Sequence, residues 1–252
     1  MAEKLRYALN RAPDSNRNTS APRPVATHTA HLRVRQRLAA QSRWRMGFYP
    51  LAAYRVWKRA MDLVVAASAG LMLAPVLAAV ALLIKLHDGG PVLYWQTRVG
   101  KRGRHFAFPK LRSMMMGADA MRARLDAQNE DSDGVIFKIR RDPRITPIGR
   151  FIRKYSLDEL PQLWCVIRGE MTLVGPRPPL VSEVPRYTAD DWGRLEVVPG
   201  LTCLWQVRGR SDLSFRQQVA LDLEYIRTRG VFTDLRILAQ TVPAVLTGRG
   251  AY

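Results

Sequence analysis

Two adjacent carboxylates inside a strongly basic stretch are the side chains of this sequence best suited to chemistry. Asp158 and Glu159 lie within residues 142–179, which read DPRITPIGRFIRKYSLDELPQLWCVIRGEMTLVGPRPP. An ionised carboxylate can act as a nucleophile or hold a metal ion, and guanidinium groups bind phosphate. The stretch therefore predicts a site for a phosphorylated, anionic substrate, because both carboxylates are framed by basic residues: Arg144, Arg150, Arg153, Lys154, Arg168 and Arg177.

The carboxylates are expected to begin a helix. Ser156 and Glu159 fit a capping box, with Ser156 as the N-cap and Glu159 as the third helical residue. Apolar residues then recur at helical spacing up to Gly169, a residue that commonly ends helices. The positive end of the helix would favour the ionised form of both acids. The simpler interpretation is that Glu159 only closes the capping box.

Further basic residues are expected to be delivered by a hairpin and a rigid turn. Residues 92–100 and 105–114 resemble two strands around the tight turn KRGR, and this hairpin would bring Lys110, Arg112 and Ser113 to one place. Arg177 lies between Pro176 and Pro178. A restricted backbone favours phosphate binding, because less freedom is lost on binding. A purely structural turn is the alternative.

The remaining segments have simpler patterns. Residues 114–128 and 214–228 are predicted to be helices, the second with Ser214 as its cap. Residues 234–247 are predicted to form a last helix that breaks near Pro243. Residues 197–212 are expected to form a turn, a strand and a basic loop, and residues 183–192 a helical or irregular stretch. Asp222 and Glu224 are expected to be solvated or ion-paired.

The charge of the chain narrows the classes of partner. The formal net charge is +19, and residues 1–59 hold 13 Lys or Arg against two acids. This balance suits nucleic acid, an anionic membrane surface or a polyphosphate substrate. Cys165 and Cys203 are isolated, and no Cys/His spacing suggests zinc. Residues 1–56 are expected to be a disordered basic tail, within which residues 31–45 form either a surface helix or a linker.

An uncharged run is the second landmark. Residues 63–84 contain no charge and are long enough to cross a bilayer. Pro75 lies in the middle, Asp62 precedes the run, and basic residues flank both ends. The positive-inside rule expects asymmetric flanks for a spanning helix. A helix that enters, bends at Pro75 and returns to the same face fits all three features; an ordinary span and a buried core helix are the alternatives.

Several strings resemble a known family. FPKLRSMMMGA, the stretch from DPRITPIGR to VGPRP, VPGLTCLWQVRGRSDLSFRQQVALDLEYI and the terminal GAY resemble the polyprenyl-phosphate sugar-1-phosphate transferases, also called monotopic phosphoglycosyl transferases. The resemblance covers roughly residues 57–252. It implies the transfer of hexose-1-phosphate from a UDP-sugar to undecaprenyl phosphate, giving undecaprenyl-diphosphate-sugar and UMP, as the first membrane step of exopolysaccharide, capsule or O-antigen synthesis.

The resemblance also implies roles for residues. Asp158 would be the nucleophile that carries the phosphosugar, and Glu159 would serve the Mg²⁺ site. The residues predicted to bind substrate are Lys110, Arg112, Arg153, Arg177 and Gln162. Two positions depart from the family's pattern. Ala74 replaces the serine that precedes the bending proline, which makes the bend less secure, and Arg208 replaces a small residue, which obscures the choice of sugar.

These inferences combine into one predicted architecture. The fold class is α+β: a basic tail (1–56), a re-entrant membrane helix (57–88) bent at Pro75, and a small, mainly helical cytosolic catalytic domain (89–252) with short β-hairpins. The expected partners are a UDP-sugar, polyprenyl phosphate and an anionic phospholipid bilayer, with no nucleic acid and with a homodimer left open. The expected location is the cytoplasmic face of the bacterial inner membrane.

Two other classes of function compete with this hypothesis. The chain could be a membrane-tethered basic binding protein, or an inactive family member that acts as an assembly partner. A binder does not need an acid pair framed by arginines, and the aromatic residues are not interleaved with basic ones as nucleic-acid stacking requires. The substitution Asp158→Asn separates the hypotheses, because only the transferase would lose its function.

Overall fold

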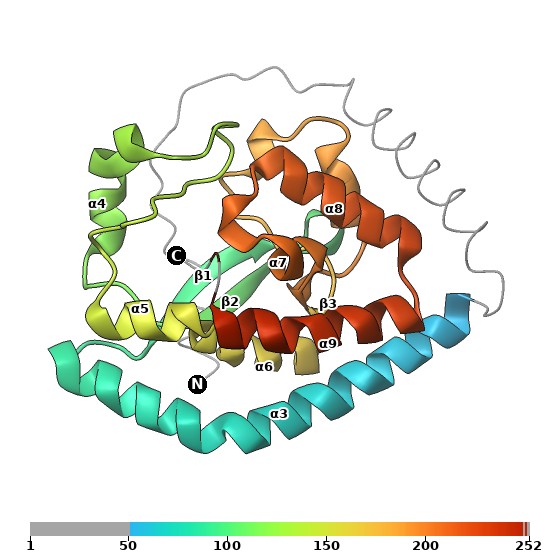
Figure 1. Ribbon diagram of the computed structural model, residues 1–252, viewed down its shortest axis with the longest axis horizontal. Helices are drawn as coiled ribbons and strands as arrows, with labels where there is room; N and C mark the ends of the chain where they lie inside the picture. The colour runs from blue at the N-terminus through green and yellow to red at the C-terminus, as the bar shows by residue number, and fades with distance from the viewer. Residues whose placement is uncertain (1–50, 249, 251–252) are drawn as a thin grey trace.

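A computed structural model describes residues 51–248 and residue 250, so the predictions for residues 1–50 of the tail and for the last two residues of the terminal GAY lie outside the described residues. The prediction of a disordered tail is wrong for residues 51–56, which are helical. The described residues combine helices with short strands, as predicted; one small sheet is a hairpin, and the other is a parallel pair rather than a second hairpin (Figure 1). The strands are β1 (Leu93–Val99), β2 (His105–Leu111), β3 (Thr172–Val174) and β4 (Gly200–Thr202). The α-helices are α3 (Leu51–Asp88), α4 (Ala118–Leu125), α5 (Pro147–Lys154), α6 (Leu163–Arg168), α7 (Leu204–Arg208), α8 (Phe215–Thr228) and α9 (Val231–Thr247).

Short 3-10 helices connect these elements. They are η1 (Lys101–Gly103), η2 (Asp126–Gln128), η3 (Leu157–Gln162), η4 (Val184–Arg186), η5 (Asp191–Glu196) and η6 (Arg210–Asp212). The predicted helix over 114–128 is therefore shorter, as α4 followed by η2. The predicted irregular stretch over 183–192 contains η4 and the start of η5.

Helix α3 lies along the underside of the domain, beneath α5, α6 and α9 (Figure 1). It begins at Leu51 rather than residue 57, and it remains one helix through Pro75, with a bend near its middle instead of a break. Within the described part of the chain it is the one helix long and apolar enough to cross a membrane. Its length and composition indicate membrane association.

Both halves of α3 pack against the same domain. Ala66 in the first half is fully buried in the main core, while Val80 and Ile84 in the second half pack with Leu111 and Ile152. Most of the other apolar side chains of α3 face outward. The prediction of a simple buried core helix is therefore wrong.

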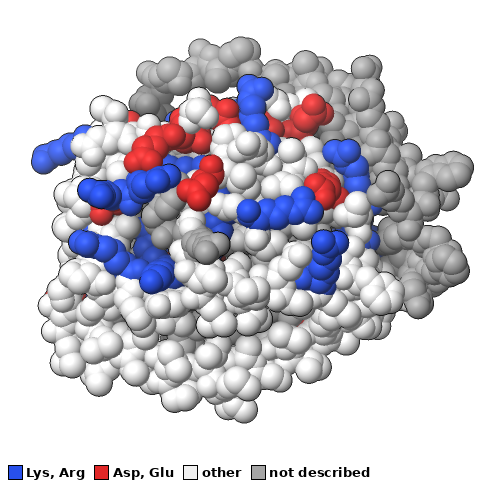
Figure 2. Space-filling view, viewed as in Figure 1, with Lys and Arg blue, Asp and Glu red and all other residues white. Residues whose placement is uncertain are grey.

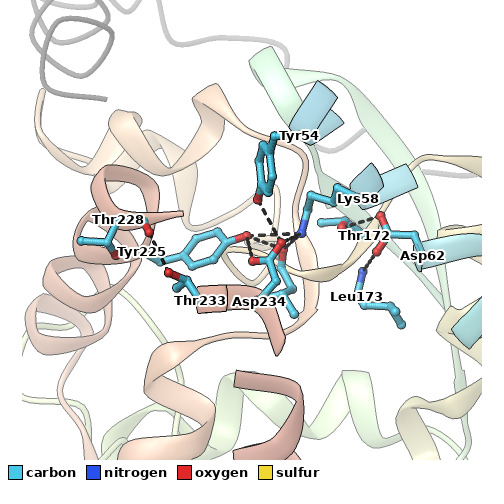
Figure 3. A network of polar contacts seen from close by, with 10 residues as sticks. Tyr54, Lys58, Asp62, Thr172, Leu173, Tyr225, Thr228, Thr233 and Asp234 are labelled. Carbon is cyan, nitrogen blue, oxygen red and sulfur yellow. Dashed lines mark hydrogen bonds and ion pairs between the residues drawn. The ribbon is translucent and has the colours of Figure 1, made fainter. Parts of the chain in front are cut away.

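Polar contacts attach each end of α3 to the domain. The Tyr54 hydroxyl donates to Asp234 Oδ2 at 2.9 Å near the first end, and Arg112 Nη1 donates to Asp88 Oδ2 at 2.6 Å at the last residue. Asp62 accepts hydrogen bonds from the Leu173 amide and the Thr172 hydroxyl, at 2.9 and 2.6 Å (Figure 3). Asp62 is therefore a buried link between α3 and β3.

The predicted hairpin is confirmed. Strands β1 and β2 pair antiparallel, with Tyr94 opposite Lys110 and Arg98 opposite Phe106. Opposite residues of such a pair share one face of the sheet. Strands β3 and β4 form a parallel pair, and a side chain at Gly200 would lie 2.1 Å from the Gly175 amide nitrogen. This close approach requires glycine.

The helices after β4 correct two predictions and confirm a third. Residues 204–208 form α7 rather than strand or loop, because β4 ends with its single partner β3 and the following apolar residues turn inward. Helix α9 begins at Val231 and does not break at Pro243; Ile237 is buried, and Thr241 bonds Thr202 at 2.8 Å. Packing thus overrides the helix-breaking tendency of proline. Ser214 caps α8 with a full capping box, as predicted.

Candidate active site

The segment that carries the two carboxylates differs from its prediction. Ser156 adopts a left-handed conformation with φ of 53°, and its side chain makes no capping bond. Instead, its Oγ accepts a hydrogen bond from Arg210 Nη2 at 2.7 Å. The predicted capping box is wrong, because the Glu159 carboxylate binds cations rather than the backbone of Ser156. The acids lie on the 3-10 helix η3, which continues into α6 and ends at Gly169 as predicted.

Glu159 is held by two cations. The Arg177 guanidinium donates to both of its carboxylate oxygens, with Nη1 to Oε2 at 3.1 Å, and Lys110 Nζ lies 3.5 Å from Oε1. Burial by itself would raise the pKa of Glu159, but the charges of Arg177 and Lys110 outweigh it and hold this pKa well below its usual range. Glu159 is therefore ionised and aligns both cations.

Asp158 is in a different state, although it is the adjacent residue. It is 5% exposed, and its carboxylate accepts no hydrogen bond from another described residue. Burial raises its pKa and the charge of Glu159 adds to this, while Lys110 and Arg153 oppose it. Asp158 lines a cavity of about 540 Å³ that Arg177 and Lys110 also line. A carboxylate without hydrogen-bond donors keeps its lone pairs available for attack.

The face of the hairpin next to Asp158 carries two half-buried cations, Lys110 and Arg98. The pKa of Lys110 is lowered to about 8, because burial and the charge of Arg177 lower it more than the charge of Glu159 raises it. Arg98 was not predicted as a site residue, but it lines the cavity and donates from Nη1 to the Pro178 carbonyl at 3.0 Å. Burial and the charge of Arg177 lower the pKa of Arg98 to about 10. The alternation of side chains along the hairpin could have identified Arg98, because it places Arg98 on the face of Lys110.

A buried ion pair supports Arg177 from behind, and its arginine, Arg194, was not predicted as a site residue. Arg194 Nη2 lies 2.5 Å from Asp222 Oδ2 and 3.5 Å from the Arg177 carbonyl. Asp222 is fully buried, so the prediction of an ion pair is confirmed and that of a solvated acid is not. The signal was available, because Asp222 recurs at helical spacing with Val219 and Ile226 on the apolar face of α8.

The structure brings together most of the predicted site residues. Lys110, Arg153, Asp158 and Arg177 line one cavity, with Glu159 directly behind them. Two others lie apart from the acids. Arg112 also lines this cavity but pairs with Asp88. Gln162, the last residue of η3, is fully buried, and neither of its amide atoms has a partner among the described residues.

Comparison with known proteins identifies the family. The family model described as "Bacterial sugar transferase" matches residues 53–248. The chain belongs to the bacterial sugar transferase family. It is 40% identical to the exopolysaccharide production protein ExoY of Rhizobium meliloti over 198 residues, 77% of this chain and 88% of that protein.

The chain covers different shares of two other relatives. The chain is 40% identical over 218 residues to the UDP-glucose:undecaprenyl-phosphate glucose-1-phosphate transferase of Caulobacter vibrioides, 82% of this chain and 76% of that one. It is 41% identical over 207 residues to the galactosyl transferase CpsE of Streptococcus agalactiae, 82% of this chain. The matched region spans 45% of CpsE, less than half of its length.

The described residues of this family member do not by themselves build a magnesium site. No group of three or more His, Cys, Asp or Glu side chains that could hold a metal occurs within the described residues. Both oxygens of Glu159, the residue predicted to serve the metal, already accept hydrogen bonds from Arg177. Magnesium does not need a dedicated protein cage, because it is commonly bound by one or two carboxylates together with substrate phosphates.

Proposed function

We propose that this protein transfers hexose-1-phosphate from a UDP-sugar to undecaprenyl phosphate, through a covalent phosphosugar intermediate on Asp158. The single observation that carries the proposal is Asp158 itself: a buried carboxylate without hydrogen-bond donors among the described residues, in a cavity lined by Arg98, Lys110 and Arg177. The name of the Caulobacter relative describes this type of reaction for glucose. The sugar that this chain transfers is left to experiment.

The proposed reaction has two displacements at one carboxylate. An Asp158 oxygen attacks the β-phosphorus of the UDP-sugar, the bond from this phosphorus to the bridging oxygen breaks, and UMP leaves. An oxygen of undecaprenyl phosphate then attacks the same phosphorus and releases Asp158. Arg177 and Lys110 would offset the negative charge of the phosphates, which otherwise repels the carboxylate. Glu159 would position these two cations.

Magnesium belongs to the proposal through the family resemblance. Because the oxygens of Glu159 are taken by Arg177, the ion would be bound chiefly by oxygens of the UDP-sugar diphosphate. No step of the proposed reaction is assigned to it. Removal of Mg²⁺ with EDTA is expected to lower UMP release and to leave the melting temperature of the substrate-free protein unchanged.

The membrane arrangement is part of the same proposal. We propose that α3 enters one leaflet and returns, so that the catalytic domain stays on the cytoplasmic face of the inner membrane. This is supported by the contacts of Tyr54 and Arg112, which attach both ends of α3 to one domain. An ordinary span would place these ends on opposite sides of about 30 Å of hydrocarbon, where one domain could not contact both.

The surface of the protein also supports this arrangement. Figure 2 shows charged side chains over the upper part of this face and almost none over the lower part, where α3 and α9 lie. Large apolar side chains are exposed on four helices of this underside. Such a surface suits burial in a lipid leaflet. They include Val56, Leu71, Met72 and Leu86 of α3, Phe151 of α5, Trp164 of α6, and Phe232 and Leu246 of α9.

The experiment measures UMP release from a panel of UDP-sugars by purified protein with undecaprenyl phosphate and Mg²⁺. Release with one sugar is expected, and Asp158→Asn is expected to lower it by at least about 10³-fold, because the nucleophile is removed. Asp126→Asn, on an exposed acid outside the cavity, serves as the matched control. A phosphorylated adduct trapped on wild-type protein and absent from Asp158→Asn would identify the intermediate.

The alternatives predict other results from the same assay. If neither the wild type nor Asp158→Asn releases UMP from any UDP-sugar, although both are folded and lipid-bound, the result would favour the binding protein or the inactive family member. Equal turnover of wild type and Asp158→Asn would reject the covalent intermediate on Asp158.

A further inference from the structure

A second cavity, of about 520 Å³, lies at the N-terminal end of α3. It shares no lining residue with the cavity of Asp158. Helix α3, the turn η1, the end of α6 and the junction between α8 and α9 form its walls. Two acids, Asp62 and Glu196, line it together with six basic residues: Arg55, Lys58, Arg59, Lys101, Arg168 and Arg229.

Three of these cations have partners within the fold. Lys58 lies 2.8 Å from Asp234 Oδ2 and donates to the Val174 carbonyl at 2.9 Å (Figure 3). Arg59 donates to two carbonyls at the end of α6, at 2.7 Å each, and Arg168 lies 3.3 Å from Glu170. Lys58, Arg59 and Arg168 therefore line the cavity with their charges and hydrogen-bond donors already paired within the fold.

The other three cations are different. The side chains of Arg55, Lys101 and Arg229 make no ion pair or hydrogen bond with another described residue. They lie close enough to repel one another, since burial and then the charges of Arg102, Arg55 and Arg229 lower the pKa of Lys101, an effect that Glu196 only partly offsets. Asp62, the other acid of the cavity, is already occupied by Thr172 and Leu173. The cavity therefore concentrates positive charge that a bound anion would neutralise.

The surroundings of these cations indicate where the anion comes from. Val56, next to Arg55, is 71% exposed, and Phe232, three residues after Arg229, is 80% exposed. The uncharged run of α3 starts about two turns further on, at Leu63. The cavity thus lies where the charged surface meets the apolar underside, which is the level of phosphate groups in a lipid leaflet that takes up this underside.

We propose that this cavity is a binding site for the phosphate group of an anionic glycerophospholipid, with Arg55, Lys101 and Arg229 as its ligands and Val56 and Phe232 against the acyl chains. A free phosphate would meet the same cations but would not use the two apolar side chains. The site is separate from the cavity of Asp158, so the proposal rests on the proposed membrane arrangement and not on the transferase reaction.

The test measures lipid binding to the full chain in neutral detergent micelles, where no charged surface contributes. Native mass spectrometry gives the dissociation constants for phosphatidylglycerol and phosphatidylcholine, and inorganic phosphate is added as a competitor. The double variant Lys101→Ala/Arg229→Ala is expected to bind phosphatidylglycerol about 30-fold more weakly. The matched control Arg104→Ala/Arg227→Ala removes the same charge from exposed positions outside the cavity and is expected to change binding less than about twofold.

Three results would overturn the proposal. Equal weakening in both double variants would show that net charge, and not this cavity, attracts the lipid. Equal affinity of the wild type for phosphatidylcholine would show that the anionic headgroup is not recognised. Phosphatidylglycerol that binds no more tightly than inorganic phosphate would identify a soluble anion as the ligand. Equal melting temperatures of both double variants ensure that the comparison reports on binding rather than folding.

Discussion

Two clusters of this protein combine carboxylates with basic side chains, but one pairs its buried carboxylate completely and the other does not. The anchoring cluster joins α3 to α8 and α9 through Tyr54, Lys58, Tyr225 and Asp234. There Asp234 is fully buried, with Oδ2 accepting from Tyr54 and Lys58 and Oδ1 accepting from Tyr225 at 2.8 Å. Every oxygen of this carboxylate has a donor (Figure 3).

The catalytic cluster consists of Lys110, Asp158, Glu159 and Arg177. It satisfies one carboxylate, Glu159, and leaves the other, Asp158, without a donor from the described residues. Backbone strain is also found here. Three described residues other than glycine have positive φ, and two of them, Ser156 and Arg210, are hydrogen-bonded to each other beside Asp158. A fully paired carboxylate stabilises a fold, whereas a desolvated carboxylate without donors is kept reactive at the expense of stability.

The largest expected effect comes from breaking the anchoring cluster. Asp234→Asn leaves the Lys58 ammonium without its counter-charge, and the free energy of unfolding is expected to fall by about 3 kcal/mol. Thermal denaturation in detergent measures this. Asp158→Asn is the matched comparison, and its melting temperature is expected to stay equal or rise, because a costly buried charge is removed. A larger loss of stability in Asp158→Asn would refute the contrast between the clusters.

The second prediction concerns the geometry of the catalytic cluster. Arg177→Lys keeps the charge but cannot donate to both oxygens of Glu159. Transfer is expected to fall by about 10- to 100-fold in kcat/KM, with little change in melting temperature. Arg168→Lys, at a half-exposed pair with Glu170, is the control and is expected to retain activity within about twofold. Full activity of Arg177→Lys would mean that charge alone is needed.

The third prediction follows from the titration of Lys110. Its pKa is lowered to about 8, so its positive charge is lost as the pH rises through 8, and activity is expected to fall there. On the acid side activity is expected to rise with pH as Asp158 ionises, because the nucleophile must be deprotonated. The variant Lys110→Arg keeps its charge at higher pH and should move the alkaline limb upward. An unmoved limb in this variant would exclude Lys110 as the titrating group.

The smallest expected effect tests the strain beside Asp158. Ser156→Gly and Ser156→Ala both remove the hydroxyl that binds Arg210, but only glycine adopts a positive φ without penalty. Ser156→Gly is therefore expected to be more stable than Ser156→Ala by about 1 kcal/mol. Chemical denaturation of the two variants measures this difference. Equal stabilities would mean that the left-handed turn carries no strain.

Local signals in the sequence predicted the elements that have a regular spacing of apolar residues or clear capping and turn residues. The hairpin was predicted by two strand-like runs around KRGR, the cap of α8 by Ser214, and the end of α6 by Gly169. These features depend on interactions within a few residues. The capping box at Ser156 has the same kind of local signal, and it failed because distant cations compete for Glu159.

By itself, the sequence determined the family, the two carboxylates, the basic residues around them and the long apolar helix. Only the tertiary structure decided which charges meet. It pairs Arg112 with Asp88 rather than with Asp158 or Glu159, joins Arg194 to Asp222, and gives Asp158 no donor from the described part of the chain beside a fully bound Glu159. The physical reason is that ion pairs depend on burial and on partners far apart in the chain, whereas residue type and spacing report only on near neighbours.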